Sequence, residues 1–287
     1  MIIDPTALVT ELFENDRRKG FDDPALGPMF DPPFVGVADA SDPWFARFKD
    51  LIGDFHWSPQ EALELVAPEA RARSVISWCL PVARVARVAN RAETLMPARN
   101  WAYVRTFGEE LVTRLRHGLE ERLRELGFAA VAPAVQPACD VQVRPRVGLS
   151  SRWSERHVAF VAGLGTFGLS GGLITRRGIA HRLGSLVTSA ELPPTPRPYG
   201  DDAFAWCLRT ARGTCGVCVQ RCPVESVGET VQARDKNRCR DHAYHYISRE
   251  GRERFGWEGV YGCGLCQTAV PCEERNPTAT PPPAQQG

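Results

Sequence analysis

Eight of the ten cysteines in this 287-residue chain fall between Cys207 and Cys272. Within that stretch, Cys215-x2-Cys218-x3-Cys222-Pro223 matches the latter part of the bacterial ferredoxin motif, in which thiolates hold a [4Fe–4S] cluster and the cysteine before proline serves a second cluster. Eight thiolates are the number that two four-cysteine clusters require. The sequence therefore predicts two [4Fe–4S] clusters in the carboxy-terminal part of the chain.

The order of the cysteines predicts which of them share a cluster, because the fourth cysteine of each ferredoxin motif ligates the other cluster. By this crossed pattern one cluster takes Cys207, Cys215, Cys218 and Cys272, and the other takes Cys222, Cys239, Cys263 and Cys266. Two features depart from the motif. Arg212 stands where the first ligand is expected, and the spacing Cys266-x5-Cys272 lengthens the usual three-residue gap.

Two other uses of cysteine compete with this prediction. Paired C-x-x-C loops also build structural zinc sites, although the Cys-Pro context and the count of eight favour clusters. Disulfides fit less well, because the start of the chain is acidic and lacks the apolar stretch of a signal peptide. We therefore expect a cytoplasmic protein, since a reduced compartment suits thiolate ligands.

Composition excludes some partners. The net charge is +1, which gives no bulk electrostatic case for binding DNA or other nucleic acid. No apolar run approaches the roughly 20 residues of a membrane helix. With 43% hydrophobic residues, the length allows one large domain and a small one.

The amino-terminal half carries several local signals. We expect residues 1–55 to form an arm packed on the main domain, with a short helix over Ala7–Phe13. Ser58-Pro59-Gln60-Glu61 is a capping box that predicts a helix to about Val66. The apolar, partly β-branched run Ser74–Pro81 predicts a buried strand.

Further along, leucines at three- and four-residue intervals predict a long helix from Trp101 that is capped by Gly127. The sequence also predicts a helix over 154–162 with Ser154 as N-cap, and extended chain over 129–135 and 140–147. Residues 173–175 and 183–189 are expected to pair in one sheet. A proline-rich stretch, 192–200, marks the domain boundary, and residues 276–287 are expected to be a disordered tail.

The segment Gly163–Gly172 contains G-x-G-x-x-G, the pattern of dinucleotide-binding loops. That fingerprint must follow a strand and open a helix, with an acid about 20 residues further on. Here a helix is expected first, and position 188 is Thr188. The pattern therefore indicates backbone packed closely against a neighbouring strand or against a bulky cofactor.

Over residues 70–275 the chain resembles the epoxyqueuosine reductase family and, more distantly, the reductive dehalogenases. The resemblance is carried by ARSVISWCLP, by SERHVAFVAGLGTFGLSGGLIT and by the eight cysteines that end in YGCGLCQTAVPCE. Glu155-Arg156 and the Ala162–Gly165 segment match the family's E-R…A-G-L-G pattern in unbroken register.

This resemblance implies an α+β or α/β fold with a nitroreductase-like core, residues 56–195, and a ferredoxin-like two-cluster domain, residues 196–275. It implies that cobalamin binds between the two domains and that electrons pass through the clusters to cobalt. The residues expected at the cobalamin are Arg156, Gly163, Leu164, Gly165, Thr166, Phe167 and Gly168.

One departure from the family bears on the reaction. The aspartate that epoxyqueuosine reductases use as proton donor falls on Leu149, and no carboxylate lies between Asp140 and Glu155. Epoxyqueuosine itself is therefore not the expected substrate. The candidates for the proton donor are Tyr103 and His157, with His242, Tyr244 and His245 as further possibilities.

Three functions remain open from the sequence. The first is a corrinoid-dependent reductase of a small or RNA-borne substrate, supplied with electrons by a low-potential ferredoxin or flavodoxin. The second is an electron-transfer protein without corrinoid that serves a partner enzyme or holds another redox group. The third is a zinc-stabilised binding module.

Overall fold

The computed structural model describes residues 3–144 and 148–279. Within them the largest sheet has four antiparallel strands in the order β1-β2-β8-β3. These strands are β1 (Phe34–Asp39), β2 (Ser74–Pro81), β8 (His181–Thr188) and β3 (Ala130–Val131). β2 has the bounds that its apolar, β-branched sequence predicted, and every residue in it is buried. Its central position in the sheet explains the continuous apolar run.

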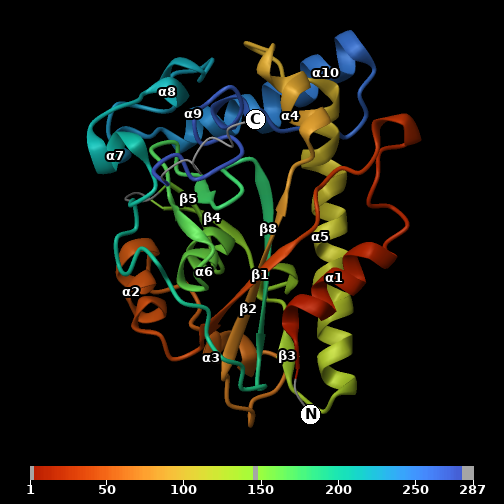
Figure 1. Ribbon diagram of the computed structural model, residues 1–287, viewed down its shortest axis with the longest axis vertical. Helices are drawn as coiled ribbons and strands as arrows, with labels where there is room; N and C mark the ends of the chain where they lie inside the picture. The colour runs from red at the N-terminus through yellow and green to blue at the C-terminus, as the bar shows by residue number, and fades with distance from the viewer. Residues whose placement is uncertain (1–2, 145–147, 280–287) are drawn as a thin grey trace, which may run out of the picture.

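Helices cover both faces of this sheet, so the fold is a mixed α/β fold of three layers (Figure 1). Ile76, Trp78 and Leu80 of β2 pack toward α1 and α5, while Val75 and Cys79 pack toward α2, α3 and α6, because successive strand residues face opposite sides. The helices around the sheet are α1 (Pro5–Asn15), α2 (Pro43–Ile52), α3 (Pro59–Glu64), α4 (Arg84–Arg91), α5 (Arg99–Glu125) and α6 (Glu155–Val161).

The predicted helices form, with one difference in capping. Ser58 and Glu61 make the reciprocal hydrogen bonds of the capping box at the start of α3. At α6 the side chain of Ser154 caps no backbone N–H, because its Oγ lies 2.7 Å from His157 Nδ1 instead. Ser154 therefore occupies the N-cap position, but its side chain contacts His157 instead of the helix backbone.

Three expectations about the sheet are corrected. Residues 1–55 are more than an arm, since β1 pairs with β2 along six residues and α2 packs in the core. Residues 173–175 do not pair with 183–189, because β7 (Leu173–Thr175) pairs with β6 (Gly165–Phe167) in a separate two-stranded sheet. In 129–135, Pro133 begins a 3₁₀ turn that ends the short strand β3.

β4 (Val141–Arg144), which pairs with β5 (Gly148–Ser151), forms four residues of the extended chain predicted for 140–147; residues 145–147 lie outside the described part. Of the predicted disordered tail, residues 280–287 are likewise outside it. Residues 276–279 are described, and the carbonyl of Thr278 accepts a hydrogen bond from Arg212 at 2.9 Å.

From residue 189 to residue 279 the chain forms short helices and loops and no strand. The helical portion of this part lies across one end of the sheet, at the top of Figure 1. Its helices are α7 (Leu208–Arg212), α8 (Val217–Gln220), α9 (Lys236–Arg240) and α10 (Ile247–Phe255), with a π-helical turn at Asp241–Tyr246 and 3₁₀ turns at Val231–Ala233 and Leu265–Gln267. Among the described residues no helix combines the length and apolarity needed to cross a membrane.

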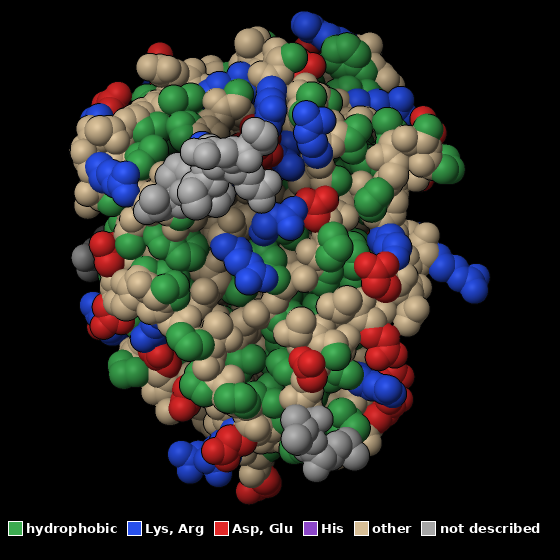
Figure 2. All heavy atoms as spheres, viewed as in Figure 1, with side chains coloured by type: hydrophobic (Ala, Val, Ile, Leu, Met, Phe, Trp, Pro, Cys, Tyr) green, Lys and Arg blue, Asp and Glu red, His purple; other side chains and the backbone are tan. Residues whose placement is uncertain are grey.

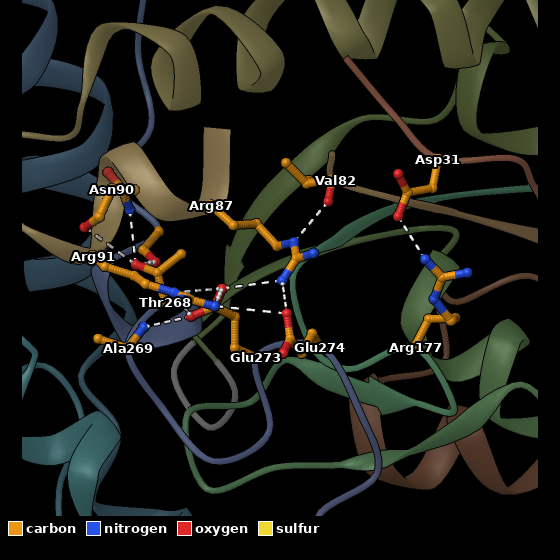
Figure 3. A network of polar contacts seen from close by, with 11 residues as sticks. Asp31, Val82, Arg87, Asn90, Arg91, Arg177, Thr268, Ala269, Glu273 and Glu274 are labelled. Atoms are coloured by element: carbon orange, nitrogen blue, oxygen red, sulfur yellow. Dashed lines mark hydrogen bonds and ion pairs between the residues drawn. The ribbon is translucent and has the colours of Figure 1, made fainter. Parts of the chain in front are cut away.

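Ion pairs join the carboxy-terminal part to α4 (Figure 3). The buried carboxylate of Glu273 lies 3.1 Å from Arg87 and 2.8 Å from Arg91, and Asn90 donates to Thr268 Oγ1 at 3.0 Å. In the view of Figure 2, lysine and arginine side chains gather over this region of the surface. The residue before Glu273 is Cys272, so these ion pairs help to hold one of the predicted cluster ligands in place.

Candidate functional site

The structure brings the eight cysteines into two sets of four. The thiols of the first set line one small cavity between the β6–β7 sheet and the carboxy-terminal loops: Cys207, Cys215, Cys218 and Cys272. The second set lines a different and much larger cavity: Cys222, Cys239, Cys263 and Cys266. These are the two sets that the crossed ferredoxin pattern groups together, although the first spans 65 positions of the chain and the second spans 44.

The two sets lie close together, because Cys218 and Cys272 of the first and Cys222 and Cys266 of the second pack against the same hydrophobic cluster. Burial raises the pKa of Cys218 to about 12, and the next cause is the charge of Cys266 from the second set, followed by Cys207 and Cys215. Burial also raises the pKa of Cys272, with Cys218, Cys207 and Cys215 as its charged neighbours. Thiols this crowded repel one another as thiolates, so they need cationic iron or zinc, or protons, to coexist in the folded chain.

Cys222 is stabilised as a thiolate by the backbone. Burial disfavours its charge, but N–H groups of Val224, Ser226 and Val227 outweigh burial and lower the pKa of Cys222. The N–H of Ser226 donates to Cys222 Sγ at 3.2 Å. Hydrogen bonds to cluster sulfurs are one means by which proteins set reduction potential.

The donor atoms fit iron–sulfur clusters, whose ligands are cysteine thiolates. In residues 3–144 and 148–279 no group of three or more His, Cys, Asp or Glu side chains is arranged to hold a single metal ion. Cys79 and Cys139 stay outside both sets; Cys79 packs in the core, and Cys139 lies on the wall of the large cavity.

Tight backbone geometry positions the loops that carry the thiols. Cys215 has φ +73°, and Gly264 between Cys263 and Cys266 has φ +67°. A Cβ on Gly264 would lie 2.0 Å from Trp101 Nε1 on α5, so only glycine allows this loop to approach the helix.

Arg221, which precedes Cys222, holds four backbone carbonyls at once. Its Nε donates to Leu265 and Thr268 at 3.3 and 3.2 Å, and its terminal nitrogens donate to Glu93 at 2.9 Å and Asn90 at 3.2 Å. The side chain thus joins the first C-x-x-C segment, the second one and the end of α4. Sequence reasoning missed it, because nothing local distinguishes it from a solvated arginine.

The large cavity has a volume of about 570 Å³ and lies between the sheet end and the carboxy-terminal part. Its lining includes five arginines and two glutamates: Arg105, Arg116, Arg156, Arg182, Arg234, Glu109 and Glu155. A volume of this size falls in the usual range for ligand sites, roughly 300–1,000 Å³. The surplus of arginine makes the cavity cationic.

Glu109 is the centre of the charged wall formed by α5 and β8. Arg182 bonds to it directly, and Arg116 lies 3.1 Å away. Burial disfavours the charge of Glu109, but Arg182 and Arg116 outweigh burial and lower its pKa to about 2. Arg116 also reaches Glu155 at 2.9 Å, and there burial outweighs the arginine and raises the pKa of Glu155.

Of the residues predicted to contact cobalamin, the structure brings Arg156 to the wall of the large cavity and leaves Gly163–Gly168 outside its lining. Gly165 approaches a strand, since a Cβ there would lie 2.1 Å from the carbonyl oxygen of Ile174. Thr166 is buried and accepts from the N–H of Trp206 at 3.0 Å. The close approach predicted for the glycines is therefore made to β7 at Gly165 and to Pro196 at Gly163.

The two residues predicted as proton donors also lie off the cavity lining. Tyr103 packs against Phe21 and Phe107 on the far side of α5, and burial, followed by Asp22, raises its pKa to about 12. His157 packs against Phe48 and Phe167, and burial lowers its pKa well below the usual value.

Two of the further candidates do face the large cavity. Tyr244 lines it and accepts a hydrogen bond from Arg105 at 3.0 Å through its hydroxyl oxygen. His242 also lines it, with Nε2 3.1 Å from the carbonyl oxygen of Leu95. His245 is exposed and outside the lining.

Solved structures that are similar to this chain include epoxyqueuosine reductases. The one from Streptococcus thermophilus is 19% identical with a TM-score of 0.42, and the match covers 84% of this chain and 62% of that chain. The one from Bacillus subtilis is 18% identical with a TM-score of 0.44, over 95% and 67%.

An epoxyqueuosine reductase solved with an epoxyqueuosine-modified tRNA stem loop is 18% identical with a TM-score of 0.49, over 94% of this chain and 66% of that chain. The chain thus spans about two thirds of the length of these proteins. No family model and no curated protein matches the sequence. The resemblance to epoxyqueuosine reductases that the sequence motifs indicated is confirmed as a resemblance.

Proposed function

We propose that this protein is an iron–sulfur reductase that carries two [4Fe–4S] clusters and delivers electrons to an acceptor in the large cavity. One observation supports the proposal above all: each predicted set of four thiols lines one cavity, and the second set opens onto the space of about 570 Å³. Four-cysteine sets are the usual ligands of such clusters.

Electrons would enter at the cluster on the first set and leave from the cluster on the second. Two observations support this order: the second set lines the large cavity, and Cys218 and Cys266 pack against the same hydrophobic cluster, which brings the two sets together. The donor would be a low-potential ferredoxin or flavodoxin. In this proposal the core is nitroreductase-like, and residues 196–275 form the ferredoxin-like domain.

A corrinoid is the proposed acceptor. When bound, a corrinoid supplies a metal centre able to reduce organic substrates by two electrons. The cavity fits such a group in two respects: thiols of the second set form part of its wall, and side-chain N–H groups on the wall can donate to the amide oxygens of a corrinoid.

The residues of this chain would bind, orient and shield the reactants. Arg156 would hold a hydrogen-bond acceptor of the ligand, since its position is fixed by donation to the carbonyl of Gly171. Tyr244 is the side chain on the cavity wall best suited to donate a proton, because its hydroxyl oxygen accepts from Arg105 and its proton stays free to be donated.

The substrate is proposed to differ from epoxyqueuosine. The position of the family's aspartate is occupied by Leu149 in β5, whose carbonyl accepts from Lys236 at 3.4 Å. A leucine offers no proton. We therefore propose a small or RNA-borne substrate that is reduced with a different proton donor.

Anaerobic purification with iron, sulfide and zinc analysis tests the proposal. We expect about eight irons and eight sulfides per chain from two [4Fe–4S] clusters. Zinc with little iron would contradict it and leave a zinc-stabilised module. Cobalamin added to the iron-loaded protein should co-elute with it and change its absorption spectrum; an unchanged spectrum with full iron would indicate an electron carrier without corrinoid.

A further inference from the structure

Unsatisfied polar atoms concentrate on the large cavity. In the described part of the chain, seven buried side-chain nitrogen or oxygen atoms lack a hydrogen-bond partner, and five of them belong to residues that line this cavity. The five are Arg116 Nε, Glu155 Oε2, His181 Nδ1, Arg182 Nε and Arg234 Nε. Buried polar groups are nearly always paired in folded proteins. Their concentration here indicates groups that a bound molecule satisfies.

His181 defines one contact that this molecule must make. Its Nε2 lies 2.7 Å from the carbonyl oxygen of Leu173, so Nε2 carries the proton and donates it. Burial, together with the charges of Arg182 and Arg156, lowers the pKa of His181 to about 4, and the ring is neutral. Nδ1 is then an acceptor, and the ligand must present a donor to it.

Arginines that line the cavity together with His181 define the second contact. Arg156, Arg182 and Arg234 are all part of this lining, and the side chain of Arg156 is exposed. Arg156 donates to the carbonyl of Gly171, and no carboxylate of the described residues pairs with it. Cys239 offsets part of its charge. The cationic charge that remains favours an anion.

We propose that the substrate carries an oxyanion, a carboxylate or a phosphate group, that binds Arg156 and Arg182 and presents a hydroxyl to His181. Guanidinium groups bind carboxylate and phosphate through short, charge-assisted hydrogen bonds, often two at a time. The inference rests on the proposed function for the reaction, but the binding site itself depends only on the cavity. It narrows the substrate class to small acids and phosphate esters.

Equilibrium dialysis of the anaerobically purified, iron-loaded chain against inorganic phosphate and sulfate tests the site. Both are oxyanions of similar shape and charge, but phosphate keeps a hydroxyl at neutral pH and sulfate does not. We expect about one phosphate per chain and weaker binding of sulfate, with His181→Phe abolishing the difference. Equal binding of the two anions by the native chain would contradict the His181 contact.

Arginine variants locate the anion. Arg156→Gln and Arg182→Gln should each weaken phosphate binding by about tenfold or more, because each removes a charge-assisted hydrogen bond. Arg177→Gln is the matched control, since Arg177 pairs with Asp31 outside the cavity lining. Iron content of each variant shows whether it folds. No phosphate binding by the native chain, or equal loss in the control, would overturn the proposal.

Cobalamin separates the two sources of an oxyanion, because it carries a phosphodiester of its own. Phosphate binding that persists with saturating cobalamin supports a substrate site. Displacement of phosphate by cobalamin assigns the arginines to the cofactor and overturns the substrate proposal. A chain that binds phosphate but holds zinc instead of iron would refute the proposed reductase while leaving the oxyanion site intact.

Discussion

Cys218 and Cys222 are four residues apart, yet their thiols face different cavities. The short helix α8 ends between these two cysteines. Pro223, which follows Cys222, then directs the chain away from the first set. The same division recurs at Cys266 and Cys272, which are six positions apart. Single substitutions should therefore affect one cluster at a time.

Cys218→Ala should remove the cluster on the first set and Cys266→Ala the one on the second. Each variant should retain about four of the eight irons expected from two clusters, because three thiolates hold a cubane poorly. Iron analysis and electron paramagnetic resonance of the reduced protein measure the loss. Full iron in either folded variant would contradict the crossed grouping, and Cys79→Ala, outside both sets, is the control.

His56 makes the fold sensitive to acid. It is fully buried beneath α2 and accepts from the N–H of Ser154 at 3.2 Å. Burial, followed by the charge of Lys49, lowers its pKa from 6.5 to about 4. Between these two values the unfolded chain binds a proton that the folded chain does not, so stability falls as the pH falls.

The expected loss from this group between pH 7 and pH 4 is about 3 kcal/mol of unfolding free energy, at about 1.4 kcal/mol per pKa unit. Denaturant unfolding across this range should show a shallower pH dependence for His56→Gln than for the native chain. His117→Gln, at an exposed position on α5, should keep the native dependence. An unchanged slope in His56→Gln would show that the histidine does not titrate on unfolding.

At the scale of elements, α5 links the core to the second cluster set. Trp101 in its first turn contacts the loop at Gly264, and a Cβ on Gly262 would lie 2.3 Å from Arg105 one turn later. The long helix therefore serves as a rigid support on which the Cys263–Cys266 loop rests. Its amphipathic sequence indicated a helix but gave no sign of this second role.

Gly264→Ala should displace this loop, because the added methyl group collides with Trp101 and the residue needs φ +67°. We expect loss of iron from the second cluster with the first retained. Gly256→Ala is matched to it, since Gly256 has φ +63° and no atom within 4 Å of an added Cβ. It carries the same backbone strain, about 1 kcal/mol, without the collision. Similar iron loss in both variants would assign the effect to strain.

At the scale of the molecule, the ion pairs between Glu273 and α4 help to hold the carboxy-terminal part on the core. The side chains of Arg87 and Glu273 are 8% and 4% exposed, so this ion pair is shielded from water. Glu274 also pairs with Arg87, at 2.5 Å, but is 54% exposed. Removing the buried partner leaves an uncompensated charge, whereas an exposed one is replaced by solvent.

Glu273→Gln should therefore destabilise the protein by about 3 kcal/mol and loosen Cys272 beside it, lowering the iron of the first cluster. Glu274→Gln should cost less than about 1 kcal/mol and leave the iron unchanged. Thermal unfolding together with iron analysis measures both. Equal effects in the two variants would show that the contribution of this ion pair to stability does not depend on the burial of Glu273.

Sequence alone predicted the features that depend on near neighbours along the chain. The strand at Ser74–Pro81 follows from its apolar residues, the capping box at Ser58 and Glu61 forms within one turn, and the cysteine spacings indicate cluster chemistry. The C-x-x-C and Cys-Pro patterns act within a few residues, which is why they are legible without a fold.

Only the tertiary structure decided which residues face the cavity. Glu109 and Arg182 come from a helix and a strand that are 73 positions apart, and Arg116 meets Glu155 across 39. Gly165 shows that the cofactor prediction depended on the fold: its sequence indicated a close approach, and strand pairing with β7 provides that approach. A sequence records that a residue must pack or pair, whereas its partner is chosen by the packing of distant segments.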